Sequence, residues 1–491
     1  MTDPISPPEL IWAESVEHWS GSADVLVVGY GIAGACAALE AQRSGADVLV
    51  IERASGGGGA SALSAGIFYF GGGTEAQRAA GYEDTSDAMF DFLMASTGAP
   101  DARLVRRYCD NSVAQFEWLE AQGVPFNRGY YKGKAVIAPT DDCLASTGNE
   151  KVWPYHGIAT PAPRGHKVAK EGDGGGALAM NALIVACEQE GVRVASDSRV
   201  NALIGDAAGR IVGVRARQSD GQKYFRARRG VILAAGAFGM NREMLDHYAP
   251  TLPDSCVPLG IPNNDGDAIR LGLSAGAALR SMGGIIATAS YYPPEQLIKG
   301  ILVNNRGERF VAEDSYHGRT GQAIREQPGT VAYLIVDSET FAYPEVSRAQ
   351  HRFVDGWETV PEMEQGLELP PGSLQRTLAD YNEGAGHGED PLYHKHADWL
   401  QPLDKPPYAA FELSYSNSYY YYITLGGMAT DADARVLGVD GQPISGLFAA
   451  GACVSSIAQD GKGYASGLML GPASYFGRVA GQNAAQANGE G

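Results

Sequence analysis

The sequence is short of positive charge and of paired cysteines. Its 491 residues include 38 Lys and Arg against 57 Asp and Glu, which gives a formal net charge of −19. A nucleic-acid-binding protein would carry a basic face, so we expect no nucleic acid among its partners. The six cysteines are scattered and form no CxxC pair. This pattern favours reduced thiols, and we expect neither a disulfide framework nor a metal site.

Long hydrophobic runs are also absent from the sequence. No uninterrupted apolar stretch approaches the roughly 18 residues that a membrane-spanning helix needs. The opening residues, Met-Thr-Asp-Pro-Ile-Ser-Pro-Pro-Glu, lack the basic and apolar regions of a secretory signal peptide. We therefore expect a cytoplasmic protein without an integral membrane segment.

Apolar residues and glycine, by contrast, are plentiful. Hydrophobic residues make up 44% of the chain and charged residues 19%, which supplies a large core and excludes overall disorder. A chain of 491 residues exceeds the size of one core, so we expect about two or three domains. The 64 glycines are nearly twice the usual share of about 7% and follow no Gly-X-Y period. Such an excess predicts many close approaches of backbone to a ligand.

A strand–helix–strand unit stands near the start of the chain. Residues 24–28 are a short apolar run, typical of a strand buried on both faces. The motif Gly-Tyr-Gly-Ile-Ala-Gly follows at 29–34, then a helix-forming stretch over 35–44 and a second apolar run over 47–51 that ends at Glu52. This order predicts a βαβ unit in which the glycines lie where the first strand turns into the helix.

The arrangement is the dinucleotide-binding fingerprint in its full context. Gly29 makes the tight turn, Gly31 lets a pyrophosphate approach the backbone, and Gly34 lets helix and strand pack closely. The helix N-terminus presents unpaired N–H groups to the pyrophosphate. Glu52 lies 18 residues past Gly34, near the separation expected of an acid that binds a ribose hydroxyl.

Further regular elements are predicted later in the chain. Alternating or apolar runs predict strands and a closing helix, in order over 191–200, 211–217, 230–239, 446–451 and 478–485. Two other clusters are interpreted as structural. A strand over 419–422 places its four tyrosines on alternate faces, so at most two could line a pocket. Glu308 and Arg309 are interpreted as structural charges of a β-turn.

The loop over 56–66 favours FAD over NAD as the dinucleotide. Its sequence, Gly-Gly-Gly-Gly-Ala-Ser-Ala-Leu-Ser-Ala-Gly, is a run of backbone donors and hydroxyls just past Glu52. An NAD enzyme has no need of such a loop there. A flavin, by contrast, must be held along its phosphates and its ring edge.

From this loop onward the chain resembles the flavoprotein family of fumarate reductase, succinate dehydrogenase and the 3-ketosteroid dehydrogenases. Four further segments carry the resemblance, 231–239, 307–311, 424–427 and 446–451. It implies one FAD, held non-covalently because no histidine lies in the loop before Gly66. The FAD-binding residues that it implies are Gly29, Gly31, Ile32, Ala33, Gly34, Glu52, Arg53, Ala60, Ser61, Ser64, Ala65, Gly66, Val200, Ala235, Gly236, Asn241, Gly451, Ala452, Ser466 and Leu468. Ala452 departs from the family, since many relatives have there a glutamate that contacts the ribityl chain.

The nucleotide-binding features lie at both ends of the chain and are missing from its middle. We therefore predict an α/β protein with a discontinuous, Rossmann-like FAD-binding domain over 1–280 and 411–491. An inserted α+β substrate (cap) domain is predicted over 281–410. Residues 126–176, rich in Gly, Pro and Tyr, predict a lid or entrance loop.

Two stretches favour the steroid branch of the family over the dicarboxylate branch. Fumarate and succinate enzymes hold substrate carboxylates with a histidine and an arginine. The equivalent stretches here, 282–294 and 455–468, lack those residues, and the second contains Tyr464 and Ser466. With Tyr316, these two resemble the tyrosine, tyrosine and serine set of 3-ketosteroid Δ4-(5α)-dehydrogenases. The Δ1 branch typically has Tyr-Pro-Gly-x-Gly where this chain reads Gly-Tyr-Ala-Ser-Gly.

The resemblance implies a role for each member of this set. Tyr464 donates to the C3 ketone oxygen, Ser466 removes the C4 proton and Tyr316 relays it toward solvent, while the C5 hydride goes to flavin N5. Two alternatives stay open. Tyr464 could be a packed aromatic of the core, and Arg319 could be the functional residue of its segment in place of Tyr316.

The leading hypothesis is an FAD-dependent oxidoreductase of CH–CH groups that introduces a C4–C5 double bond into a 3-ketosteroid. One alternative is a 3-ketosteroid Δ1-dehydrogenase. Another is a fumarate reductase-like enzyme that binds a small dicarboxylate through Arg319 and His317. A flavin-binding redox sensor or electron carrier is disfavoured by the large central insertion. The sequence leaves open the electron acceptor, the steroid substituents and the oligomeric state.

Overall fold

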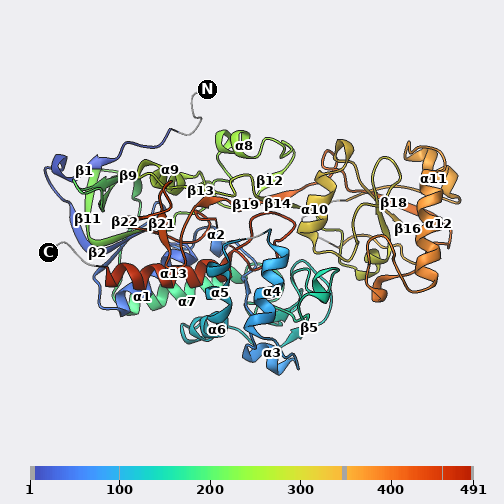
Figure 1. Cartoon of the computed structure of the whole chain (residues 1–491), viewed down its shortest axis with the longest axis horizontal. Coiled ribbons are helices and arrows are strands. Elements are labelled where there is room, and N and C mark those ends of the chain that lie inside the picture. The colour runs from blue at the N-terminus through green and yellow to red at the C-terminus, as the bar shows by residue number, and fades with distance from the viewer. Residues whose placement is uncertain (1–5, 99, 346–350, 456, 488–491) are drawn as a thin grey trace.

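A nine-stranded mixed sheet forms one end of the molecule, on the left of Figure 1. The computed structural model describes residues 6–98, 100–345, 351–455 and 457–487. The main strand order is β1-β9-β10-β11-β2-β3-β8, and β22 pairs with β11 and β21. These strands are β1 Ile11–Trp12, β2 Gly21–Val28, β3 Val48–Ile51, β8 Arg193–Ala195, β9 Arg199–Gly205, β10 Ile211–Gln218, β11 Gly221–Leu233, β21 Arg435–Leu437 and β22 Pro443–Ala449.

Both faces of the central strands are buried. Val25 and Val27 of β2 face the helices, whereas Leu26 and Val28 belong to a second core on the opposite side. The helices that cover the first face lie side by side under the sheet in Figure 1 and are α1 Ile32–Arg43, α7 Gly175–Gln189 and α13 Leu470–Gln486. Burial on both sides is why these strands are continuous apolar runs rather than alternating ones.

The predicted βαβ unit is present as β2, α1 and β3, with β2 and β3 parallel. Other predicted elements were wrong in their bounds. The strand predicted over 230–239 ends at Leu233, as part of β11, and the strand predicted over 419–422 is β19, Tyr421–Thr424. The run over 191–200 is two strands, β8 and β9, because Asp197 has a left-handed φ of 52° that breaks the extended backbone. The closing helix α13 begins at Leu470, eight residues before the predicted start.

A four-stranded antiparallel sheet lies at the opposite end of the molecule, on the right of Figure 1. Its strands, in spatial order, are β15 Ile301–Val303, β16 Tyr333–Val336, β18 Tyr408–Glu412 and β17 Arg352–Trp357. It shares a separate apolar core with α11 Val360–Gly366 and α12 Ser373–Gly386. The division into FAD-binding and cap domains stays a prediction, and its second border, at residue 410, falls inside β18.

Shorter elements connect these two ends. One sheet contains β4 Ile67–Tyr69, β7 Gly165–Lys167, β6 Leu144–Ala145 and β5 Tyr130–Tyr131, another contains β12 Val257–Pro258, β19 Tyr421–Thr424 and β14 Ile285–Thr288, and a pair is formed by β13 Leu279–Arg280 and β20 Gly427–Met428. The remaining α-helices are α2 Gly59–Ala62, α3 Glu75–Ala79, α4 Ser86–Ser96, α5 Ala102–Asp110, α6 Ser112–Ala121, α8 Arg242–Tyr248, α9 Asp267–Ser274 and α10 His317–Arg325. Within the described ranges, no helix is both long enough and apolar enough to cross a membrane.

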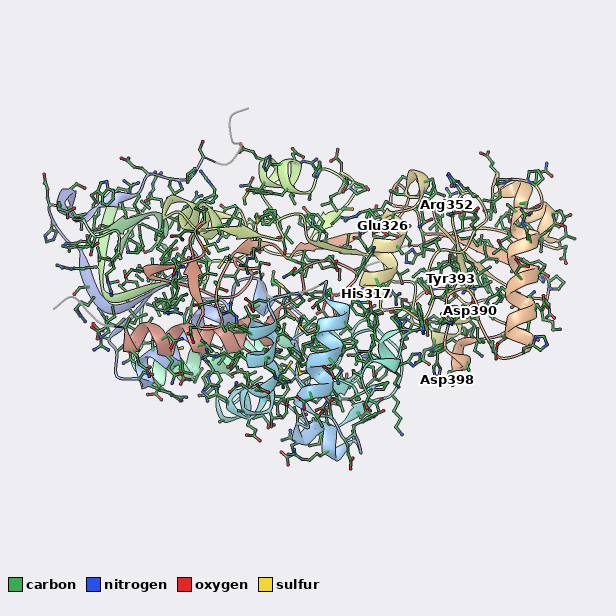
Figure 2. The ribbon with its side chains drawn as sticks, viewed as in Figure 1. His317, Glu326, Arg352, Asp390, Tyr393 and Asp398 are labelled. Atoms are coloured by element: carbon green, nitrogen blue, oxygen red, sulfur yellow. The ribbon has the colours of Figure 1, made fainter. Side chains whose placement is uncertain are left out.

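Arg309 has the structural role that was predicted for it, but in a buried ion cluster rather than within a β-turn. Its guanidinium donates to Glu313 at 2.8 Å and to Asp390 at 2.9 Å, and Lys395 lies 3.5 Å from Glu313. Asp390 and Tyr393 are seen between α10 and α12 in Figure 2. Glu308, in contrast, is exposed next to the turn that closes at Gly307. A side chain as long as arginine can leave a turn and be buried when carboxylates pair with it.

Candidate active site

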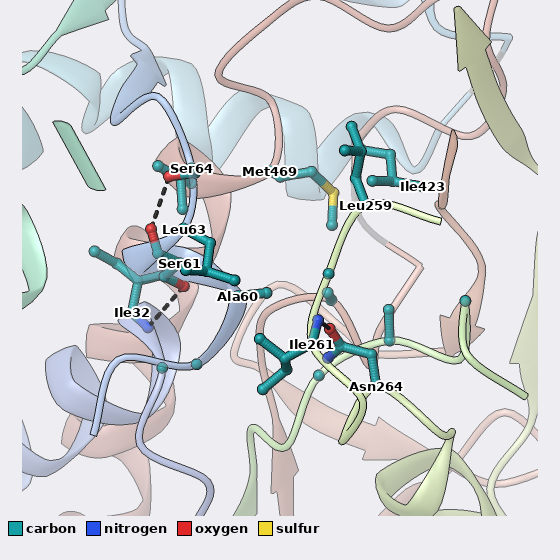
Figure 3. Close-up of a pocket in the computed structure, with 18 of the residues that line it drawn as sticks. Ile32, Ala60, Ser61, Leu63, Ser64, Leu259, Ile261, Asn264, Ile423 and Met469 are labelled. Atoms are coloured by element: carbon teal, nitrogen blue, oxygen red, sulfur yellow. Dashed lines mark hydrogen bonds between the residues drawn. The ribbon is translucent and has the colours of Figure 1, made fainter. Parts of the chain in front are cut away.

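A cavity of about 1080 Å³ runs from the β2–α1 turn to the first residues of α10. Its walls come from the carboxyl ends of β2, β3 and β11, from β12, β14 and β19, and from the loop before α13. Apolar side chains line much of it, and Figure 3 shows Leu63, Leu259, Ile261, Ile423 and Met469 around one part. A largely apolar cavity with a few polar groups is the usual form of a small-molecule site.

The β2–α1 turn has the backbone that a pyrophosphate requires. Gly29 has a φ of +100°, and a Cβ at this position would lie 2.6 Å from the Ala234 carbonyl oxygen. A Cβ on Gly34 would lie 2.0 Å from the Gly29 oxygen, so helix and turn touch there. The first turn of α1 has no side-chain cap, although Ile32 N–H donates to Ser61 Oγ at 3.2 Å (Figure 3). The uncapped helix end fits an anion.

Glu52 is held at the end of β3 by backbone donors. Its carboxylate accepts from Tyr30 N–H at 2.7 Å and from Ala54 N–H at 2.8 Å. The next residue, Arg53, donates to Asp265 at 2.6 Å. Glu52 therefore faces the cavity in a fixed orientation, as a carboxylate that binds a ribose hydroxyl must.

Most of the predicted FAD-binding residues line this one cavity. They are Gly29, Gly31, Ile32, Ala33, Glu52, Arg53, Ala60, Ser61, Ser64, Ala65, Val200, Ala235, Gly236, Gly451, Ala452 and Ser466. Segments from residue 29 to residue 466 thus meet around one ligand-sized space. The set fits an extended dinucleotide, because glycine backbones, a helix N-terminus and a carboxylate follow one another along the wall.

The structure places four predicted FAD-binding residues outside the cavity wall. Gly34 serves the contact between helix and turn, and Gly66, with a φ of +72°, packs against Gly175. Leu468 is part of the apolar core. Asn241 caps α8 by accepting from Met244 N–H at 3.1 Å, and its amide donates to the Asp265 carbonyl. The side chain of Asn241 is thereby committed to a helix end.

The three predicted catalytic residues come together at the far end of the cavity. Tyr316 Oη and Ser466 Oγ are 2.7 Å apart, although 150 residues separate them. The ring of Tyr464 lies 6.4 Å from that of Tyr316, centroid to centroid. All three line the cavity, Tyr316 from the N-cap of α10 and the other two from the loop before α13. A tyrosine–serine hydroxyl pair and a second phenol therefore face the same space.

Burial keeps these hydroxyls neutral. Desolvation raises the pKa of Tyr316 well above its ordinary value, and the nearby Tyr464 raises it further. Desolvation also raises the pKa of Tyr464. The adjacent His317 has its pKa lowered to about 3 by burial, and its Nδ1 lies 2.7 Å from Thr288 Oγ1. At neutral pH Tyr316, Tyr464 and His317 are thus uncharged hydrogen-bonding groups.

Arg319 points away from the cavity. Its guanidinium donates to the Trp153 carbonyl at 3.1 Å and lies 5.5 Å from the centre of the Tyr155 ring. It is not among the described residues that line the cavity, whereas Tyr316 is. Of the two candidates in this segment, Tyr316 has the geometry of an active-site residue.

Sequence reasoning missed a group of polar residues behind the catalytic pair. Asn149, Thr147 and Glu150 lie in the predicted lid or entrance segment, and they contact the backbone of Tyr316 and Ser466 or lie close to it. No local motif marks them, since their role depends on contacts across more than 150 residues. The tyrosines over 419–422 do alternate, with Tyr421 on the cavity and Tyr420 in the core.

Comparison with known proteins places the chain among flavoproteins. The family described as "FAD binding domain" matches residues 24–464. The chain is similar to the crystal structure of 3-ketosteroid-Δ4-(5α)-dehydrogenase from Rhodococcus jostii RHA1 in complex with 4-androstene-3,17-dione. The identity is 41%, the TM-score 0.92, and the match covers 97% of this chain and 99% of that one.

Curated relatives are more distant and include both dehydrogenases and reductases. The 3-oxo-5-alpha-steroid 4-dehydrogenase of Comamonas testosteroni is 29% identical over 88% of this chain and 93% of its own. A probable fumarate reductase of Shewanella frigidimarina is 28% identical over 95% of this chain and 75% of its own.

Proposed function

The chain belongs to the FAD binding domain family and is an FAD-dependent oxidoreductase, and from this premise we propose that it dehydrogenates 3-ketosteroids at C4–C5. The observation that carries the proposal is the Tyr316–Ser466 pair, with its 2.7 Å hydroxyl contact, beside Tyr464 in an apolar cavity. These neutral groups suit a ketone. The 41% identity to a Δ4-(5α)-dehydrogenase supports the same assignment.

The ketone oxygen is the first group that the site has to bind. Removing a proton from C4 places negative charge on the C3 oxygen, and Tyr464 donates a hydrogen bond to it. A well-aimed donor of this kind contributes about 3–4 kcal/mol to the transition state. Because Tyr464 is buried and its pKa is raised, it remains a donor over the working pH range.

The C4 proton passes to the hydroxyl pair. Ser466 Oγ takes it as its own proton moves to Tyr316 Oη, which relays a proton toward solvent. An isolated alcohol is a very weak base, so the 2.7 Å contact is essential to this step. FAD, when bound, supplies the acceptor for the hydride that leaves C5.

The cations of the cavity lie at its nucleotide end. Among the described lining residues, the arginines are Arg53 and Arg199, and they pair with Asp265 and Asp267. With Arg319 turned toward Trp153, no arginine or lysine of the described lining lies beside Tyr316. A dicarboxylate would bury two charges there without partners, which disfavours the fumarate reductase-like alternative.

We further propose that residues 281–410 form the cap over the steroid.

The position of the new double bond tests the proposal. Purified enzyme, 5α-androstane-3,17-dione and an artificial electron acceptor are incubated, and the product is identified by NMR. We expect the double bond at C4–C5. A double bond at C1–C2 would instead favour the Δ1-dehydrogenase alternative, and an unchanged steroid would contradict the proposal.

A further inference from the structure

We propose that residues 147–150 hold Tyr316 and Ser466 in contact, with Asn149 and Thr147 as positioning residues for the reaction. The inference rests on the function proposed above. Neither residue is among the described residues that line the cavity, so neither touches the substrate. We call residues 147–150 the brace.

One side of the brace fixes Tyr316. The Tyr316 N–H donates to Asn149 Oδ1 at 2.7 Å, and both residues are buried. Tyr316 is the N-cap of α10, so its own N–H lies outside the hydrogen-bond ladder of the helix. The amide of Asn149 thus determines where the helix begins and, with it, where the phenol points.

The other side of the brace fixes Ser466. The Ser466 N–H donates to the Thr147 carbonyl at 2.9 Å, and Thr147 Oγ1 donates to the Ser466 carbonyl at 2.9 Å. Two hydrogen bonds therefore clamp the backbone of this serine. Because Asn149 is two residues away, one short segment holds both members of a pair that are 150 residues apart.

The brace is itself anchored and closely packed. Glu150 Oε1 accepts from Tyr69 Oη at 2.7 Å, and the glutamate is buried. A Cβ on Gly148 would lie 2.8 Å from Cβ of Ala465, the residue between Tyr464 and Ser466. Little room is left for the brace to shift without moving the catalytic loop.

The physical need for such a brace follows from the proton transfer. Two hydroxyls pass a proton only at hydrogen-bond distance, and a misplacement of about 1 Å can cost about 10²-fold in rate. The contact between the Tyr316 and Ser466 hydroxyls joins two segments that share no helix or strand, so the segments could shift relative to each other. A third segment, hydrogen-bonded to both, removes this relative motion before the steroid binds.

The test separates positioning from general stability. Flavin reduction by 5α-androstane-3,17-dione is followed by anaerobic stopped flow, and steroid affinity and thermal unfolding are measured on the same variants. We expect Asn149→Ala to slow reduction about 10–100-fold while the steroid dissociation constant changes by less than about threefold. Asn149→Asp, which keeps an acceptor oxygen, is expected to recover at least a tenth of the wild-type rate.

A second pair of variants keeps the proposal testable if Asn149→Ala does not fold. Thr147→Val removes the hydroxyl at constant shape and is expected to slow reduction about tenfold, whereas Thr147→Ser restores it. The matched control is Asn127→Ala, because Asn127 Oδ1 also accepts two backbone N–H groups, from Gly129 and Cys143, away from the pair. This control is expected to reduce at the wild-type rate.

Two outcomes would overturn the proposal. One is a wild-type rate in Asn149→Ala and Thr147→Val. The other is a rate that falls only in proportion to lost folded protein and equally in Asn127→Ala. Failure of the wild-type enzyme to be reduced by the steroid is a different result, since it contradicts the proposed function itself.

Discussion

At the residue scale, the proposed chemistry depends on two hydroxyls that are poor bases alone. Tyr316 and Ser466 form a 2.7 Å contact, and the ring of Tyr464, the proposed donor, lies 6.4 Å from that of Tyr316. The three residue types were predictable from the sequence through their family resemblance. The contact between Ser466 and Tyr316 is implied by the same resemblance, whereas the brace that we propose behind it was not predictable, because it has no motif of its own.

The first prediction concerns these three side chains. Tyr316→Phe and Ser466→Ala are expected to keep FAD and to slow flavin reduction by about 10²-fold or more, since each removes half of the proton path. Tyr464→Phe is expected to lose about 3–4 kcal/mol of transition-state stabilisation. Stopped-flow reduction by 5α-androstane-3,17-dione measures both effects.

The control for these variants is Tyr82→Phe. Tyr82 Oη forms a similar 2.8 Å contact with Tyr130 Oη, but neither residue is in the described cavity wall. Its rate is expected to match that of the wild type. Near-normal reduction in Ser466→Ala together with a loss in Arg319→Ala would show that the roles are assigned to the wrong residues.

The second prediction concerns pH. Burial raises the pKa of Tyr316 well above its ordinary value, so only a small fraction of the pair is deprotonated at neutral pH. Since the pH stays below the raised pKa of Tyr316, the deprotonated fraction keeps growing as the pH rises. We therefore expect flavin reduction to speed up steadily from about pH 7 to pH 10, where an unperturbed tyrosine would titrate. A rate that is level over this range would point to another base.

The third prediction concerns Glu150 and stability. Burial raises its pKa, so the folded protein retains this proton at pH values where the unfolded chain has lost it. The stability of the wild type then falls as the pH rises above the ordinary glutamate value of about 4.3. Glu150→Gln keeps an acceptor for Tyr69 without the titration.

Thermal unfolding at pH 5 and pH 8 measures this effect. We expect the unfolding temperature of Glu150→Gln, compared with that of the wild type at the same pH, to be higher at pH 8 than at pH 5. An equal difference at both values would mean that the carboxyl has an ordinary pKa in the folded protein.

At the element scale, the β2–α1–β3 unit was predictable because all its signals are local. The apolar runs, the glycine spacing and Glu52 lie within 30 residues, and each has its expected place in the structure. The break between β8 and β9 was not predictable. An aspartate with a φ of 52° looks, in sequence, like any polar residue on the exposed face of a strand.

The fourth prediction tests this unit through two glycines. Gly34→Ala places a Cβ 2.0 Å from the Gly29 oxygen, so helix and turn must separate and the protein is expected to purify without FAD. Gly386→Ala, at the end of α12, is the control, because a Cβ there meets nothing within 4 Å and the residue does not line the cavity. The ratio of flavin to protein absorbance measures the loss. Equal FAD content in both variants would contradict the role given to Gly34.

At the scale of the whole molecule, the fold class and the FAD assignment inferred from the sequence are confirmed. The ion cluster around Arg309 was not predictable from the sequence, because its partner Asp390 lies 81 residues later and belongs to no local pattern. The cavity is likewise a property of the whole chain, with walls drawn from residue 28 to residue 473. Its two ends differ, with charges and glycines at one and neutral hydroxyls at the other. This division supports the proposal that the substrate is a neutral ketone and not a dicarboxylate.

The central claim is tested most directly by anaerobic titration of the FAD-bound protein. The visible flavin absorbance is followed while 5α-androstane-3,17-dione is added, with succinate added to a parallel sample. The account predicts bleaching by the steroid at about one equivalent and no bleaching by succinate. Bleaching by succinate, or an unchanged flavin in the presence of the steroid, would contradict it.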